Sequence, residues 1–145
     1  MRCVIQRVNQ ASVTVEGKLI GSIDKGILVY FGVQKGDVEE QMRWLCDKMV
    51  KLRMFRDEND KMNLSLSDVH GQILLVSQFT LCANLHKGNR PGYDDAEEPE
   101  KANQMYSKAL SYLQSLGYTV AHGQFGAHMM VSYTNDGPVT FILEK

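Results

Sequence analysis

The amino-acid sequence predicts a single α/β domain, residues 1–145, with layered, mostly antiparallel β-sheets and two main helices. Three observations support this prediction. Several short runs of apolar and β-branched residues are typical of strands, two segments repeat apolar residues at helical spacing, and no repeat, linker or low-complexity segment divides the chain. A chain of 145 residues also fits one domain that buries roughly two thirds of its unfolded surface.

The N-terminal part is predicted to be β-structure. Residues 3–8, CVIQRV, alternate as in a strand, and residues 12–23, SVTVEGKLIGSI, are typical of a hairpin that turns at residues 16–18. Residues 26–33, GILVYFGV, are apolar throughout, so we expect a central strand that is covered on both faces.

The first helix is expected in residues 36–52, GDVEEQMRWLCDKMVKL. Asp37 is in the position of an N-cap, and Glu40 is where the acid of a capping box belongs. One apolar stripe recurs at helical spacing: Val38, Met42, Leu45, Met49 and Leu52. A short strand, LRMF, and a polar turn follow.

The second half begins with a predicted buried strand at residues 72–81, QILLVSQFTL, which runs into a long polar loop. Pro99 suits the first turn of a second helix, and Gly117 is expected just after its end. The apolar stripe of this helix is Ala102, Met105, Ala109, Leu113 and Leu116. Residues 118–126 and 127–135 are expected to be strands.

The segment NDGPV, residues 135–139, carries conflicting signals. Asn-Asp-Gly between two strand-like runs predicts a tight hairpin, because Asp-Gly tolerates the positive φ of a type I′ turn. Pro138 follows where the returning strand should donate an N–H group. Only about 5–6% of X-Pro bonds in folded proteins are cis, but a cis bond would suit such a turn. Gly137 has no Cβ, so a ligand or another chain could approach its backbone closely.

Composition excludes several classes of protein. The net charge of −1 gives no broad field for nucleic acid or anionic membrane, and no apolar run approaches the roughly 20 residues of a spanning helix. The N-terminus lacks the apolar region of a secretory signal, and the three isolated cysteines favour reduced thiols in the cytosol. The four histidines lack zinc-site spacing, so no metal is expected.

Polar residues inside the apolar run at residues 72–81 mark a candidate site. Ser77, Gln78 and Thr80 interrupt it, and their spacing alone favours a strand end that turns toward solvent. The alternative is a pocket floor that presents two hydroxyls and an amide. A nucleophilic Ser or Thr needs a nearby base, and no motif supplies one. The absence of a G-x-S-x-G elbow also argues against triad hydrolysis.

Two motifs carry a family resemblance. SQFTL, residues 77–81, and NDGPVT, residues 135–140, together resemble the signature pair of the D-aminoacyl-tRNA deacylases, formerly called D-tyrosyl-tRNA deacylases. IQRV, ASVTVEG, KMNLSL and FGAHMMVS match further family segments in order, so the resemblance covers essentially the whole chain. It implies a cytoplasmic, cofactor-free hydrolase that cleaves the ester between a D-amino acid and the 3′ adenosine of tRNA. It also implies a homodimer with its sites at the subunit interface.

In this family a cis Gly-Pro pair enters the partner subunit's site. The resemblance therefore implies that Gly137 and Pro138 screen chirality and that Arg7 helps to hold their loop. Two rigid carbonyls would bind the substrate ammonium, and an L side chain would collide with them. Glycine has no side chain to reject, so glycine mischarged onto tRNA(Ala) should also be released.

The other implied site residues form two groups. The reaction pocket is expected to be lined by Ser77, Gln78, Phe79 and Thr80. The terminal adenosine is expected next to Phe125 and Met129 and, by a looser match, Ala102. The ester is already reactive and the ribose 2′-hydroxyl can assist, so we expect the protein to orient the ester while N–H groups near Phe79 or Thr80 stabilise the oxyanion. Thr80 as a covalent nucleophile is the rival account.

One segment departs from the family. Residues 89–93 read NRPGY where relatives often carry an RRPSF-like segment, which leaves Lys87 and Arg90 as candidate phosphate contacts. Three alternatives remain open: a relative with a trans Gly-Pro bond that accepts L-alanyl-tRNA, a non-catalytic nucleic-acid-binding or protein-binding dimer, and an unrelated α/β hydrolase. The intact motifs argue against the first, and the missing elbow and triad argue against the third.

Overall fold

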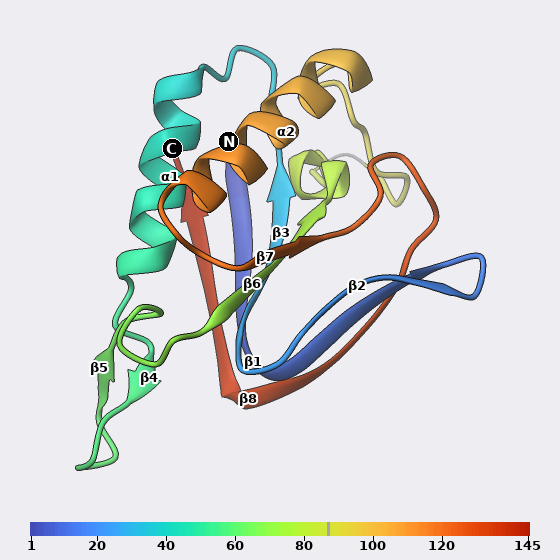
Figure 1. The fold of residues 1–145 in the computed structure, drawn as a ribbon. Helices are drawn as coiled ribbons and strands as arrows, with labels where there is room; N and C mark the ends of the chain where they lie inside the picture. The colour runs from blue at the N-terminus through green and yellow to red at the C-terminus, as the bar shows by residue number, and fades with distance from the viewer. Residues whose placement is uncertain (87) are drawn as a thin grey trace.

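Residues 1–86 and 88–145 are described by a computed structural model, in which a curved sheet of six strands carries two helices on one face (Figure 1). The sheet path is β2-β1-β3-β6-β7, and β8 pairs with the other edge of β1. Only the β3–β6 and β6–β7 pairs are parallel, so the predicted α/β fold class with mostly antiparallel pairing is confirmed. The sheet strands are β1 Arg2–Val15, β2 Lys18–Ile23, β3 Gly26–Gly32, β6 Gln72–Ser77, β7 Val120–His122 and β8 Met130–Glu144.

The remaining elements complete the chain order. A separate two-stranded sheet follows the first helix, and a short 3₁₀ helix, η1, follows β6. In the described part of the chain, no helix is long and apolar enough to cross a membrane. The elements are α1 Glu39–Lys51, β4 Phe55–Arg56, β5 Met62–Leu64, η1 Phe79–Cys82 and α2 Pro99–Ser115.

The length of β1 curves the sheet. Its first half pairs with β3 through Val8, its second half pairs with β2 from Ala11 onward, and β8 follows its other edge. The hairpin turn expected at residues 16–18 is present, with φ values of 49° at Glu16 and 76° at Gly17. The expected first strand and first arm of the hairpin are therefore one element, which bends across the molecule.

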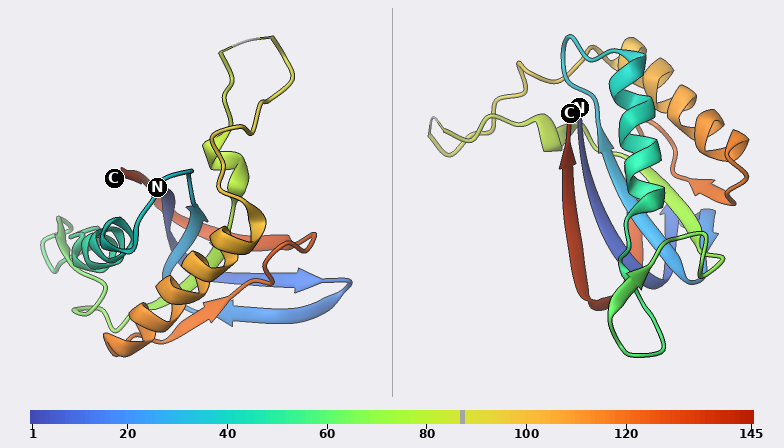
Figure 2. Two further views of the ribbon diagram at one scale, coloured as in Figure 1. Left: turned by 90° about the horizontal axis from the view of Figure 1, so that it is seen from above. Right: turned by 90° about the vertical axis from the view of Figure 1, so that its left-hand side faces the viewer.

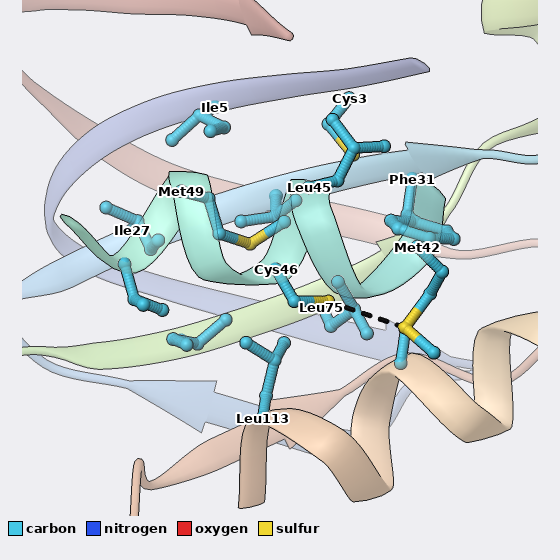
Figure 3. Packing of buried hydrophobic residues seen from close by; sticks show 14 of the residues in the cluster. Cys3, Ile5, Ile27, Phe31, Met42, Leu45, Cys46, Met49, Leu75 and Leu113 are labelled. Atoms are coloured by element: carbon cyan, nitrogen blue, oxygen red, sulfur yellow. Dashed lines mark hydrogen bonds between the residues drawn. The ribbon is translucent and has the colours of Figure 1, made fainter. Parts of the chain in front are cut away.

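Both faces of the central strands are buried, as predicted for β3. On one face, Leu45 and Met49 of α1 and Leu113 of α2 pack toward Ile27 and Leu75 (Figure 3). The opposite face has its own apolar cluster, formed by Val8, Ala11, Val13, Ile23, Leu28, Leu74 and Val76. The helices and the curled sheet thus enclose β3 and β6 and hold the end of β6 in place.

The predicted N-cap of α1 is wrong. Val38 occupies the N-cap position and is 54% exposed, so it also lies outside the buried stripe. Asp37 instead accepts the N-terminal ammonium at 2.7 Å and the N–H of Gln34 at 2.6 Å. The Gln41 side chain accepts the Val38 N–H at 2.8 Å, which is the part expected of Glu40. A contact with the chain terminus, distant in sequence, therefore takes Asp37 away from the capping role expected of it.

The ends of α2 agree with the prediction. Pro99 is its first residue, and Gly117 has a φ of 89° just after the C-cap residue Leu116. Leu116 is exposed rather than part of the stripe, and the buried aromatic of this helix is Tyr106. Ala102 and Tyr106, in the first turns of α2, belong to the same core cluster as Leu75 of β6, so the N-terminal end of α2 is fixed beside this strand.

Two expected strands are shorter than predicted. β6 ends at Ser77, and the following residues form η1, with Phe79 57% exposed. The N–H of Gln78 makes a last bond to Phe31 O at 2.8 Å, where β3 also runs out. β7 has only three residues, so residues 123–129 form a loop where strand was expected.

The predicted C-terminal hairpin at residues 135–139 is wrong. Asn135 pairs with Val8 and Thr140 pairs with Gln6, so β8 continues in one direction through the segment. The four residues between them stand opposite Arg7 alone and bulge out of the ladder. Pro138 lacks an N–H but no ladder bond is required of it there. The Gly137-Pro138 peptide bond is cis.

Candidate functional site

A cavity of about 480 Å³ opens between the end of β6, η1, the start of α2 and the loop that precedes β8. The fold brings distant segments together here, because β6 supplies one wall and α2 the opposite one. Six of the residues singled out from the sequence line this cavity: Ser77, Gln78, Phe79, Ala102, Phe125 and Met129.

The SQFTL segment forms the strand-to-helix corner of the cavity. Ser77 is half-buried at the end of β6, and Gln78 donates from its side-chain amide to the Thr80 hydroxyl. Thr80 itself is exposed and is not among the lining residues. In the described part of the chain, neither an imidazole nor a carboxylate is hydrogen-bonded to Ser77 or Thr80. The arrangement presents polar groups without an activated nucleophile.

The opposite wall is held by α2. Ala102 lies in its first turns, and Tyr106 packs against Phe125 with ring centroids 5.9 Å apart. The Tyr106 hydroxyl donates to Leu75 O at 2.8 Å. Burial raises the pKa of Tyr106 to about 12, so this hydroxyl remains a neutral donor. The contact ties the Phe125 wall to β6 and keeps the cavity width fixed.

The other three predicted residues form a separate group around the bulge of β8. Arg7 is 1% exposed, and its Nε lies 3.0 Å from both the main-chain O and the Oδ2 of Asp136. The same guanidinium donates from Nη1 to Met54 O, and Asn135 Nδ2 donates to Arg7 O at 2.9 Å. A buried guanidinium with several partners holds a bulge in one position.

Gly137 and Pro138 are exposed at the tip of this bulge and do not line the cavity of their own chain. The bend of β8 lies at the opposite end of the sheet from η1 (Figures 1 and 2). Gly137 has a φ of 142°, a region that side chains rarely adopt. One chain therefore carries the two predicted parts of the site on separate surfaces.

Sequence reasoning missed the two titratable side chains that line the cavity in the described part of the chain, Glu97 and His128. Glu97 belongs to an acidic run that reads as a favourable helix start, and His128 lies in a segment expected to be a strand. No local signal places either side chain beside Ser77, because the packing of α2 and of the 123–129 loop against β6 brings them there.

The segment between η1 and α2, described for residues 83–86 and 88–98, reaches out from the layers (Figure 2). Asn84 and Gly92 exchange backbone hydrogen bonds of 2.8 and 3.1 Å, and Tyr93 meets Phe79 edge-on at 4.9 Å. Arg90 is exposed on this arm, and Lys87 lies outside the described residues.

Other reactive groups are poorly placed for chemistry. Cys3, Cys46 and Cys82 are free and buried, and burial raises the pKa of each thiol. Within residues 1–86 and 88–145, no group of three or more His, Cys, Asp or Glu side chains is arranged to hold a metal ion.

Comparisons with known proteins agree with the site residues in pointing to one family. The family model described as D-Tyr-tRNA(Tyr) deacylase matches residues 4–144. A D-aminoacyl-tRNA deacylase of Pelobacter propionicus is 52% identical over 145 residues, with all of both chains covered. One of Clostridioides difficile is 51% identical, covering all of this chain and 97% of its own.

Two solved structures have the same fold. One, named c-Myc DNA Unwinding Element Binding Protein, matches with a TM-score of 0.94 at 40% identity and covers all of this chain and 99% of its own. A probable eukaryotic D-amino acid tRNA deacylase matches with a TM-score of 0.82 at 17% identity, over 98% of this chain and 97% of its own. At that identity the second likeness shows the fold alone.

Proposed function

The chain belongs to the D-Tyr-tRNA(Tyr) deacylase family and is a D-aminoacyl-tRNA deacylase, and from this premise we propose that the cavity beside Ser77 binds the aminoacylated 3′ end of tRNA. The observation that carries the proposal is the meeting of the SQFTL corner with Ala102, Phe125 and Met129 around one cavity. The reaction is hydrolysis of the ester in the cytoplasm, to free amino acid and tRNA.

The two walls of the cavity bind different parts of the substrate. The terminal adenosine lies between Phe125, Met129 and Ala102, and the ester lies against the SQFTL corner. The backbone N–H groups of Phe79 and Thr80 are at the start of η1, where a helix leaves its first donors without internal partners, so they can stabilise the oxyanion. Catalysis then consists of orienting the ester, the ribose 2′-hydroxyl and a water.

A second copy of the chain completes the site. Gly137 and Pro138 are exposed, held through Arg7 and Asp136, and absent from the lining of their own cavity, so they are available to a partner. In the described part of the chain, β8 pairs only with β1, and Met130 and Ile142 on it are 63% and 64% exposed. An unpaired edge with exposed apolar side chains favours a homodimer. The carbonyls of the pair then bind the substrate ammonium and reject an L side chain.

Wild-type enzyme is expected to hydrolyse D-tyrosyl-tRNA and glycyl-tRNA(Ala) and to spare L-tyrosyl-tRNA, because the filter excludes a side chain on one hand only. The three substrates are prepared with the same labelled terminal nucleotide, and the fraction of tRNA that remains aminoacylated is followed over time for each. If the enzyme cleaved the D-ester but not the glycyl ester, the filter could not work by rejecting an L side chain, because glycine has none.

Replacing the Thr80 hydroxyl with a methyl group, Thr80→Val, is expected to lower kcat by less than about tenfold, since no base activates this hydroxyl and it receives a hydrogen bond from Gln78. Single-turnover deacylation measures the effect. Complete loss of activity in a folded variant would establish Thr80 as the nucleophile, and Thr80→Ser should then restore it.

Two alternatives are separated by the same assays. A relaxed relative would hydrolyse L-alanyl-tRNA as fast as D-alanyl-tRNA. A non-catalytic binding dimer is favoured by the neighbour named for binding a DNA element, which is 40% identical to this chain. An absence of turnover on every aminoacyl-tRNA, together with retained nucleic-acid binding, would support that second function.

A further inference from the structure

Glu97 is the one carboxylate among the cavity-lining residues in the described part of the chain. It is half-buried on the α2 side, and Pro99 and Ala102 follow it along the same wall. The cavity is proposed to hold the end of a polyanion, and a carboxylate disfavours phosphate. A neutral hydrogen-bond donor on the bound group would explain its presence.

The carboxylate is held in one orientation. The Glu97 N–H donates to Val33 O at 3.0 Å, and Oε1 accepts the Glu98 N–H at 2.9 Å. Within the described residues, Oε2 has no hydrogen-bond partner and Glu97 forms no ion pair. One oxygen anchors the group, and the other has no hydrogen-bond partner among the described residues, so it can accept one from a ligand.

We propose that Glu97 Oε2 accepts a hydrogen bond from the 6-amino group of the terminal adenine, which makes Glu97 a specificity residue for the base. This inference rests on the proposed function. An ionised carboxylate only accepts, and the exocyclic amine is the donor on the Watson–Crick edge of adenine. Guanine and hypoxanthine present a carbonyl oxygen at the same position, which the carboxylate would repel. Glu97 precedes α2, whose residue Ala102 lines the part of the cavity assigned here to the base, whereas Ser77 ends β6 in the part assigned to the ester.

The Glu97→Gln variant gives a specificity test. Its single carbonyl oxygen would still accept the Glu98 N–H, so its NH₂ group would take the place of Oε2 and oppose the adenine amine. We expect kcat/KM on D-tyrosyl-tRNA ending in adenosine to fall about tenfold to a hundredfold. On the same tRNA ending in inosine, the 6-carbonyl accepts from the amide, so the variant should exceed wild type.

Controls keep the outcomes separate. Glu100→Gln removes an exposed acid from the first turn of α2, three residues after Glu97, without touching the cavity, and it should leave the preference between adenosine and inosine unchanged. Purine riboside, which lacks the amine, should be a poorer terminal nucleoside than adenosine for wild type but not for Glu97→Ala. Identical rankings of the three nucleosides in wild type and both Glu97 variants would overturn the inference. Failure of the proposed function is distinct, because wild type would then hydrolyse none of the three substrates.

Discussion

Replacing Gly137 with alanine is expected to lower kcat/KM for D-tyrosyl-tRNA by at least about a hundredfold, since displacing a positioning group by about 1 Å has an effect of this size. Gly137 has a φ of 142°, and an added Cβ would lie 2.6 Å from the backbone N of Val139 and 2.8 Å from its Cγ2. The bulge must shift to relieve these contacts. The carbonyls proposed to meet the substrate ammonium then lose their position.

Deacylation kinetics on D-, L- and glycyl-tRNA, together with thermal unfolding, measure this prediction. Gly17→Ala is the matched control, because Gly17 also has a positive φ, of 76°, but an added Cβ meets nothing within 4 Å. That variant should lose about 1 kcal/mol of stability and keep full activity. Wild-type rates and wild-type discrimination in Gly137→Ala would remove the bulge from the mechanism.

Arg7→Ala is expected to lower the free energy of unfolding by about 1–3 kcal/mol, the cost of leaving buried polar groups without their hydrogen-bond partner. Arg7 is 1% exposed. Its guanidinium pairs with the carboxylate of Asp136 and donates hydrogen bonds to the main-chain carbonyls of Asp136 and Met54. The substitution leaves these acceptors without their donor and opens a void behind the bulge. Urea denaturation followed by circular dichroism measures the loss.

Arg43→Ala is the control for the loss of an arginine. Arg43 is exposed and pairs with Glu39 at 2.6 Å within α1, so its removal should cost much less stability than the removal of Arg7. Arg7→Lys keeps a buried charge but cannot reach all partners, so it should be intermediate in stability and should slow deacylation by loosening the bulge. Equal losses in Arg7→Ala and Arg43→Ala would show that Arg7 is not a structural anchor.

Much of the fold could be predicted from local signals. The turn at Glu16-Gly17, the start of α2 at Pro99 and its end before Gly117 each depend on backbone preferences of a few neighbouring residues. The bulge at residues 135–139 could not be predicted in this way. Its residues are typical of a hairpin, but pairing of both flanks with β1 keeps β8 in one direction. The role of Asp37 could not be predicted locally either. Its carboxylate binds the N-terminal ammonium of Met1 and the N–H of Gln34 instead of capping α1.

For the candidate site, too, some residues could be predicted from the sequence and others only from the packing. Family motifs identified residues that the structure places around one cavity, from the SQFTL corner to Phe125 and Met129. The apolar run at residues 72–81 predicts a strand that includes Phe79, whereas β6 ends at Ser77 and Phe79 is 57% exposed in η1. Glu97 was missed because its proximity to Ser77 exists only after α2 packs against the sheet.

The separation of the bulge from the cavity along one chain has a genetic consequence. In the proposed dimer, each reaction centre takes its nucleoside-binding half from one polypeptide and its stereochemical half from the other. Two alleles, one damaged at the bulge and one at the cavity, would therefore co-assemble with one centre built from intact halves. Co-expression would restore function that neither allele provides alone.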